Sequence, residues 1–161
     1  MSFQTSDICD QYVQQGHLQI AESILKSYGG HPAFSGWVTT LKLFEDNSLI
    51  RSTLAEKVVE RVLVIDAGGS KRCASLDAEL AQLAIENGWQ GIVIYGSIRG
   101  SVVIKDLPIG LFALNTHPLG SDKHGHGDRD VMITFAGVNF KKDHYLYADS
   151  DGIVVSETKL D

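Results

Sequence analysis

The spacing of hydrophobic residues changes along the chain, and the changes predict alternating strands and helices. Residues 34–44 (FSGWVTTLKLF) alternate in polarity and are rich in strand-forming residues, which predicts a β-strand. Residues 62–66 and 91–96 are continuous apolar runs, typical of strands covered on both faces. Between them, residues 75–87 carry leucine and alanine at helical spacing, and Gly88 provides a stop. Strand, helix and strand in this order predict a parallel βαβ unit.

Two further helices are expected before this unit. Residues 5–7 (TSD) are typical of a helix start, and Ile8 and Tyr12 fall on one face of the helix that would follow. Asn47 is a suitable N-cap for a second helix that runs to about Val58.

The last third of the chain has a different pattern. Residues 110–114 form another apolar segment, and residues 121–130 are polar and contain glycine, as expected of a loop. Four short segments spaced like an antiparallel meander follow, at residues 131–135, 138–140, 145–147 and 152–155. We therefore predict one α/β domain over residues 1–161, with a mixed, curled sheet flanked by helices.

Composition narrows the possible classes of function. The chain has 161 residues, 43% of them hydrophobic, and a net charge of −6, so a single globular domain can fold without disulfides or a structural metal. The acidic balance argues against a broad DNA- or RNA-binding surface but suits a basic protein partner or a small anion held by local donors. No apolar run reaches the length of a membrane span, and the first residues lack a signal-peptide pattern. We expect a cytoplasmic protein that does not bind membranes.

The clearest candidate site lies where the two continuous apolar strands end. The glycine turn at residues 66–70 follows the first strand, Arg99 follows the second, and the intervening helix begins near Asp77. Open α/β sheets bind ligands at this edge, and an arginine can hold a carboxylate or phosphate through two hydrogen bonds. Two simpler interpretations stay open: the segment 66–70 is a plain tight turn, and Arg99 is a surface residue paired with an acid such as Asp106.

A second pattern, His124-Gly125-His126, is similar to a metal-binding pair, but it falls in a polar loop with no third ligand evident. The role of His124 and His126 is left open. Neither Cys9 nor Cys73 lies in a recognisable catalytic pattern, and we assign neither a role.

Six segments in order along nearly the whole chain resemble the RraA family, named for regulator of ribonuclease activity A. They are DICD (7–10), FEDN (44–47), VLVIDAGGS (62–70), NGWQG (87–91), YGSIR (95–99) and YADSDGI (147–153). The resemblance implies a fold like the swivelling domain of phosphohistidine enzymes, assembled as a homotrimeric ring. Family members have also carried the name of a menaquinone methyltransferase, but this sequence has no recognisable fingerprint for the methyl donor.

The resemblance implies one of two functions. Some relatives are divalent-metal lyases, class II aldolases that cleave 4-hydroxy-4-methyl-2-oxoglutarate or its carboxylated analogue and decarboxylate oxaloacetate. In these, an arginine holds the pyruvyl carboxylate and the next residue, an aspartate, binds Mg²⁺ or Mn²⁺. A Gly-Asp-x-Leu stretch opens the preceding helix, where its N–H groups contact the substrate and its aspartate supports a metal-bound water. Other relatives bind ribonuclease E of the RNA degradosome and lower its activity.

This sequence departs from the lyase pattern at both carboxylates. Arg99 stands at the arginine position, but Gly100 replaces the metal-binding aspartate, and Ala78 replaces the supporting one. The expected substrate- or anion-binding residues are Asp77, Ala78, Glu79, Leu80 and Arg99. We expect no metal ligand and no cofactor, with Mg²⁺ or Mn²⁺ required only by the lyase alternative.

The sequence therefore predicts a non-catalytic regulator that binds ribonuclease E, and possible further partners are other RNA-decay proteins. The alternative is a pyruvate-releasing aldolase with oxaloacetate decarboxylase activity. A third possibility is a protein that binds a small carboxylate through Arg99 without turning it over.

Overall fold

Four parallel strands form the centre of the molecule, whose computed structural model describes residues 2–160. They are β3 (Phe34–Lys42), β4 (Arg61–Asp66), β6 (Trp89–Ile98) and β7 (Gly110–Thr116), paired in that order. The parallel pairing of β4 with β6 confirms the βαβ unit predicted from the sequence.

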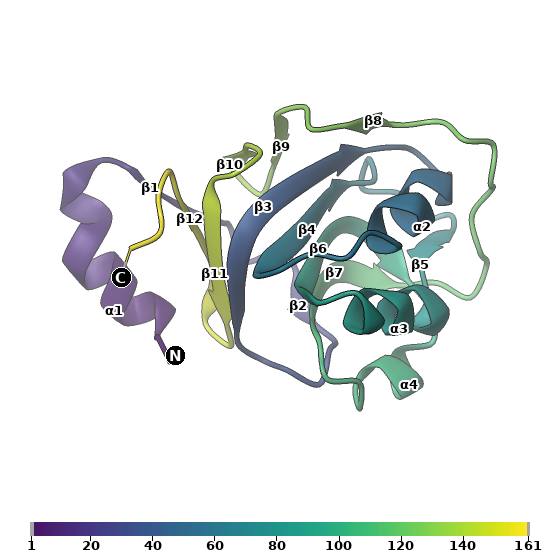
Figure 1. Cartoon of the computed structure of the whole chain (residues 1–161), viewed down its shortest axis with the longest axis horizontal. Coiled ribbons are helices and arrows are strands. Elements are labelled where there is room, and N and C mark those ends of the chain that lie inside the picture. Colours follow the sequence, from purple (N-terminus) through teal and green to yellow (C-terminus); the bar gives the residue numbers. More distant parts are fainter. Residues whose placement is uncertain (1, 161) are drawn as a thin grey trace.

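Antiparallel strands extend this centre on both sides. Beyond β3 lie β11 (Tyr145–Asp149), β12 (Gly152–Ser156) and β1 (Leu18–Ile20), and beyond β7 lies β2 (Lys26–Ser27). The two outermost strands, β1 and β2, are joined by residues 21–25. Because so few residues span at most about 20 Å, the two outermost strands, β1 and β2, lie close together. The large mixed sheet is therefore curled, as predicted (Figure 1).

Smaller strands complete the structure. β5 (Ala74–Leu76) pairs with β6, β8 (Asp128–Arg129) pairs with β3, and β9 (Ile133–Phe135) and β10 (Val138–Phe140) form a separate hairpin. A single meander over residues 131–155 was the wrong expectation, because β11 leaves the hairpin and pairs with β3 instead.

The helices are α1 (Thr5–Tyr12), α2 (Ser48–Leu54), α3 (Ala78–Glu86) and α4 (Ser101–Ile104), with a 3₁₀ turn, η1, at Val13–Gln15. Figure 1 shows α2 and α3 over one face of the parallel strands and α1 beside β11 and β12. Among residues 2–160, every helix is too short or too polar to cross a bilayer.

Two predicted helix boundaries need correction. The helix expected over residues 75–87 begins at Ala78, because residues 74–76 pair with β6 as strand β5. The helix expected to reach Val58 ends at Leu54, where the Asn87 side chain donates a 3.0 Å hydrogen bond to the Leu54 carbonyl oxygen.

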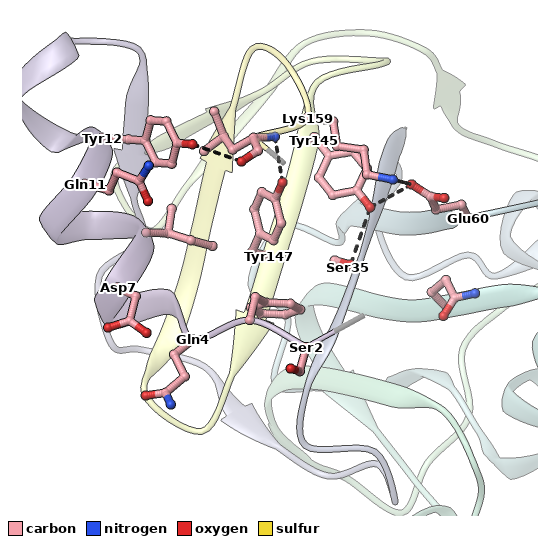
Figure 2. Close-up of a pocket in the computed structure, with 14 residues that line it drawn as sticks. Ser2, Gln4, Asp7, Gln11, Tyr12, Ser35, Glu60, Tyr145, Tyr147 and Lys159 are labelled. Atoms are coloured by element: carbon pink, nitrogen blue, oxygen red, sulfur yellow. Dashed lines mark hydrogen bonds and ion pairs between the residues drawn. The ribbon is translucent and has the colours of Figure 1, made fainter.

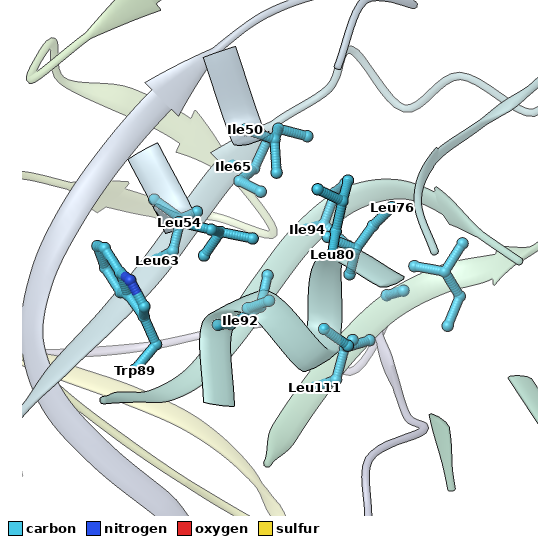
Figure 3. Packing of buried hydrophobic residues seen from close by; sticks show 14 of the residues in the cluster. Ile50, Leu54, Leu63, Ile65, Leu76, Leu80, Trp89, Ile92, Ile94 and Leu111 are labelled. Atoms are coloured by element: carbon cyan, nitrogen blue, oxygen red, sulfur yellow. The ribbon is translucent and has the colours of Figure 1, made fainter. Parts of the chain in front are cut away.

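Alternation along the parallel strands builds two cores. On one face the strand side chains pack under α2 and α3. Figure 3 shows Leu63, Ile65, Ile92 and Ile94 of the strands together with Ile50 and Leu54 of α2 and Leu80 of α3. The opposite face, including Val62, Val64 and Val93, packs inside the curl against the β9–β10 hairpin. A continuous apolar run in β4 is thus buried on both sides, which is the physical reason for its lack of alternation.

The aromatic ring of Phe34 packs directly against the backbone of two other strands. Gly91 and Gly110 are paired neighbours on β6 and β7, and the Phe34 ring from β3 lies against both. A Cβ atom at either glycine would overlap that ring. The ring also contacts Phe112, with a distance of 5.9 Å between ring centroids.

This contact predicts a non-additive pair of mutations. Gly110→Ala should destabilise the fold by about 1–3 kcal/mol, because the Phe34 ring must leave its position. Phe34→Ala alone should cost about 3–5 kcal/mol through the lost burial. In the double variant, alanine at position 34 removes the ring that the Cβ at position 110 would overlap. The loss of stability should therefore be clearly smaller than the sum of the losses in the two single variants. Urea denaturation of the four proteins measures this coupling, and strictly additive costs would contradict it.

Candidate functional site

Parallel pairing brings the carboxyl ends of β3, β4, β6 and β7 to one edge of the sheet. The segments that follow these ends are 43–47, 67–70, 99–100 and 117–121. Strand β6 continues past the end of β4 and pairs there with β5, which leads directly into α3. The residues after β6 and the first residues of α3 are therefore neighbours.

Arg99 lies directly against the start of α3, as the βαβ pattern predicted. Its backbone N–H donates to the Leu76 carbonyl oxygen at 2.9 Å, and its guanidinium Nη2 lies 3.8 Å from Asp77 Oδ2. The Nη1 group donates a long hydrogen bond of 3.4 Å to the Pro118 carbonyl oxygen. Asp106 is not the acidic partner, and 43% of the Arg99 side chain remains exposed. An exposed guanidinium at this edge can still receive a carboxylate from solution.

Asp77 caps the helix that it precedes. Its backbone is extended, with φ −134° and ψ −179°, and its Oδ1 accepts a 2.9 Å hydrogen bond from the Leu80 N–H. The Leu80 N–H is one of the backbone groups that the family resemblance expects to contact substrate. Here the Asp77 carboxylate already accepts its hydrogen bond. Glu79 points elsewhere, since its Oε1 lies 3.2 Å from Arg51 Nη1 on α2.

Ala78 and Gly100 face each other across this corner. Gly100 has φ 75° and ψ 30°, and a Cβ atom built on it would lie 3.4 Å from the Ala78 Cβ. By the family resemblance these are the two positions at which the lyases carry carboxylates; here Ala78 offers only a methyl group and Gly100 has no side chain, so neither supplies a metal ligand. Across residues 2–160 no group of three or more His, Cys, Asp or Glu residues is placed to hold a metal ion. The residues present do not fit the Mg²⁺ or Mn²⁺ of the lyases.

The structure thus brings together Asp77, Ala78, Leu80 and Arg99 of the expected site and separates Glu79 from it. Their role in binding an anion stays a prediction.

Sequence reasoning missed the strap at residues 118–121, which supports Arg99 from the other side. The strap is held to β5, because Ala74 N–H donates to the Leu119 carbonyl oxygen at 2.6 Å and Ser121 N–H donates to the Ala74 carbonyl oxygen at 3.1 Å. A Cβ atom on Gly120 would lie 2.7 Å from Arg99 Nη2. The Pro-Leu-Gly sequence of the strap is a turn signal that follows a predicted strand, and it could have indicated this location.

The glycine turn at residues 66–70 is held by hydrogen bonds within the turn and to Glu45 and Tyr95. Gly68 N–H donates to Asp66 Oδ1 at 2.9 Å, and Gly68 and Gly69 have φ of 69° and 68°. Ser70 Oγ donates to Glu45 Oε2 at 2.7 Å. Hydrogen bonds from Arg72 and then Ser70 lower the pKa of Glu45. The simpler interpretation of this segment, a tight turn, describes its geometry.

A buried carboxylate organises the loop that contains the two histidines. Asp46 is 2% exposed; its Oδ2 accepts hydrogen bonds from the His124 and His126 N–H groups at 2.7 and 3.2 Å, and its Oδ1 accepts one from Ser48 N–H at 3.0 Å. Asn47 stands at the N-cap position, as predicted, but its side chain makes no capping hydrogen bond; the Ser48 N–H donates to Asp46 instead. The imidazole rings lie 6.1 Å apart.

Burial raises the pKa of Asp46, but N–H donors from Ser48, His126 and His124 outweigh it and bring the pKa to about 2. The carboxylate therefore stays ionised and holds the loop over most of the pH range. Backbone amides of the loop, hydrogen-bonded to Asp46, hold it in place.

The fold and the site place the chain in a known family. It belongs to the RraA-like proteins, because the family described as Aldolase/RraA matches residues 5–155. A protein of Methylococcus capsulatus named "Putative 4-hydroxy-4-methyl-2-oxoglutarate aldolase" is 58% identical over 160 residues, covering 99% of each chain. A protein of Aromatoleum aromaticum with the same name is 49% identical over the same length, again covering 99% of each chain.

Two solved structures have nearly the same fold. The "RNA-processing inhibitor RraA" of Thermus thermophilis has a TM-score of 0.94 and 38% identity, covering 100% of this chain and 96% of that one. A structure from Geobacillus kaustophilus, named as an S-adenosylmethionine:2-dimethylmenaquinone methyltransferase, has a TM-score of 0.95 and 44% identity, covering 98% and 97%. These names describe three different activities, so the function of this chain must be argued from its own residues.

Asp46→Asn tests the organising role of that carboxylate. The folded-state pKa lies below the unfolded value, so the contribution is present above about pH 4 and is lost as the pH falls toward 2. At pH 7 the variant should lose roughly 1–2 kcal/mol of stability, allowing for the nearby solvent. Denaturation at pH 7 and pH 3 should show a smaller difference from wild type at pH 3. Asp10→Asn, an exposed carboxylate on α1, is the control, and an equal difference at both pH values would contradict the assignment.

Gly120→Ala tests the support of Arg99. Because the overlapping atoms belong to the end of a side chain, the guanidinium should move while the fold stays intact. Affinity for oxalate, followed by calorimetry, should fall by about three- to tenfold as one well-placed charged hydrogen bond is lost. Ser121→Ala in the same strap should leave the affinity unchanged. In an Arg99→Ala background, Gly120→Ala should cause no further loss of oxalate affinity. A further loss would show that Gly120 does not act through Arg99.

Proposed function

We propose that this RraA-family protein binds a small carboxylate at Arg99 without metal-dependent turnover and acts as a regulator of ribonuclease E. The observation that carries the proposal is the pairing of Ala78 with Gly100 at the positions of both lyase carboxylates: Ala78 offers only a methyl group, Gly100 has no side chain, and a Cβ atom built on Gly100 would lie 3.4 Å from the Ala78 Cβ. A homotrimeric ring with the fold of a swivelling domain, located in the cytoplasm, belongs to the same proposal, and light scattering of the purified protein measures the trimer.

The argument against turnover is energetic. Without a protein carboxylate, Mg²⁺ keeps its water shell and is held by substrate alone. Metal stabilisation of a developing enolate supplies several kcal/mol, so its loss costs several powers of ten in rate. Arg99 can still bind a carboxylate through its exposed donors, and binding does not need the missing groups.

The argument for a protein partner rests on charge and on the relatives. The chain carries a net charge of −6, which assembly into a trimer would triple. Such a surface attracts the basic, RNA-binding segments of an endonuclease. The name of the Thermus thermophilis structure, an RNA-processing inhibitor, supports the same class of function. Other RNA-decay proteins are further possible partners under this proposal.

The alternative is the aldolase and oxaloacetate decarboxylase activity. The names of the relatives at 58% and 49% identity support it. Under this alternative Mg²⁺ or Mn²⁺ would need ligands other than Ala78 and Gly100.

A gain-of-function variant separates the two. Wild type should release little Mg²⁺- or Mn²⁺-dependent pyruvate from oxaloacetate or 4-hydroxy-4-methyl-2-oxoglutarate, and it should inhibit ribonuclease E in a parallel assay. The double variant Ala78→Asp, Gly100→Asp should gain Mn²⁺ affinity and some decarboxylation, because Arg99 is already in place. Recovery should be partial, since an aspartate at φ 75° adds strain of about 1–2 kcal/mol and Asp77 still occupies the Leu80 N–H.

The matched control is Ala78→Asn, Gly100→Asn, which has nearly the same shape without the charges. Adding Arg99→Ala to the aspartate pair should remove the recovered turnover. Rapid wild-type turnover that EDTA abolishes would instead establish the aldolase.

A further inference from the structure

A pocket lies at the opposite end of the parallel strands from Arg99. It is formed by α1, by β11 and by the C-terminal residues 159–160, and it reaches Ser35, Glu60 and Gln90 (Figure 2). These three residues stand at the amino ends of β3, β4 and β6, whereas Arg99 follows the carboxyl end of β6. The pocket volume of about 470 Å³ lies in the range of small-molecule sites.

Aromatic rings form its walls. The Phe3 and Tyr147 rings meet edge to face with centroids 5.2 Å apart, and the Tyr145 and Tyr147 rings lie 4.9 Å apart. Tyr12 donates a 3.0 Å hydrogen bond to the Leu160 carbonyl oxygen, which joins α1 to the C-terminal segment. Tyr147 Oη accepts a 2.8 Å hydrogen bond from the Leu160 N–H. The walls are therefore held in place by contacts among residues distant in sequence.

The pocket already holds a cation, which is supplied by the chain itself. The Lys159 ammonium lies 2.8 Å from Glu60 Oε2 and 5.6 Å from the centroid of the Tyr145 ring. Tyr145 Oη donates to the same Glu60 oxygen at 2.8 Å. Hydrogen bonds from Lys159 and then Tyr145 lower the pKa of Glu60. A carboxylate beside an aromatic face is the arrangement that recognises ammonium and guanidinium groups.

The ion pair between Lys159 and Glu60 is accessible to a cation from solution. The side chains of Lys159 and Glu60 are 36% and 38% exposed, and pairs so exposed to solvent are weak. A second carboxylate, that of Asp7, lines the α1 side of the pocket, and within residues 2–160 no cation pairs with it. Two carboxylates, several aromatic rings and one partly exposed lysine thus line the same pocket.

We propose that this pocket binds a small organic cation, whose ammonium or guanidinium group contacts Glu60 and the Tyr145 ring in place of Lys159. The apolar part of the ligand lies against Phe3 and Tyr147, and Asp7 attracts a second positive group where the ligand has one. The binding is independent of the function proposed for the Arg99 edge.

Competition with Lys159 gives a sharp test. In an amide NMR titration with n-butylammonium and n-butylguanidinium, saturable shifts should centre on Ser35, Glu60, Tyr145 and Tyr147. Lys159→Met should tighten binding by about five- to tenfold, since it removes the internal competitor. Lys141→Met makes the same charge change at an exposed residue outside the pocket and should leave the affinity unchanged.

Two further comparisons protect the test from a folding defect. Glu60→Gln should weaken binding by about tenfold or more, and Tyr145→Phe, which keeps the ring, should weaken it less. The neutral isostere of n-butylammonium, 1-butanol, should bind far more weakly than either cation. Equal affinity for 1-butanol, shifts spread over the acidic surface, or Lys159→Met and Lys141→Met behaving alike would each overturn the proposal.

Discussion

Parallel pairing of β3, β4, β6 and β7 is the constraint on which the rest of the structure depends. It sends all carboxyl ends to one edge and all amino ends to the other. Arg99 and the start of α3 meet at the first edge, while Ser35, Glu60 and Gln90 meet at the second. The molecule therefore presents two chemically different groups of side chains at opposite ends of its parallel strands, an arginine at one end and carboxylates with aromatic rings at the other.

The local sequence pattern predicts an element well where neighbouring residues alone determine its structure. The apolar runs of β4 and β6 are buried on both faces, so their pattern predicted them directly. The βαβ order then placed Arg99 beside Asp77 with no further information. The start of α3 was misplaced, since helical spacing in Ser75 and Leu76 cannot reveal that they pair with β6.

Other features depend on contacts between distant segments, which no local pattern encodes. The strap at Gly120 supports Arg99 only because β5 holds it there. Glu79 faces Arg51 rather than the site, because α2 packs beside α3. Asn47 stands at the N-cap of α2 without a side-chain cap, and Asp46 accepts both the Ser48 N–H and the His124 N–H from the distant histidine loop. The resemblance to the family supplied the site positions, and the structure shows how their side chains are arranged.

The changes at the Arg99 edge are connected through Asp77. In the lyases a glycine stands there and leaves the first N–H groups of the helix open, whereas Asp77 binds the Leu80 N–H. Such a cap stabilises a helix by about 1 kcal/mol, so the residue has a structural benefit once substrate no longer needs that N–H. Its second oxygen lies 3.8 Å from the Arg99 guanidinium, so an incoming carboxylate must compete with a resident one. The absence of carboxylates at positions 78 and 100 and the presence of this internal anion both agree with the proposed function, in which the Arg99 edge binds a carboxylate without turning it over.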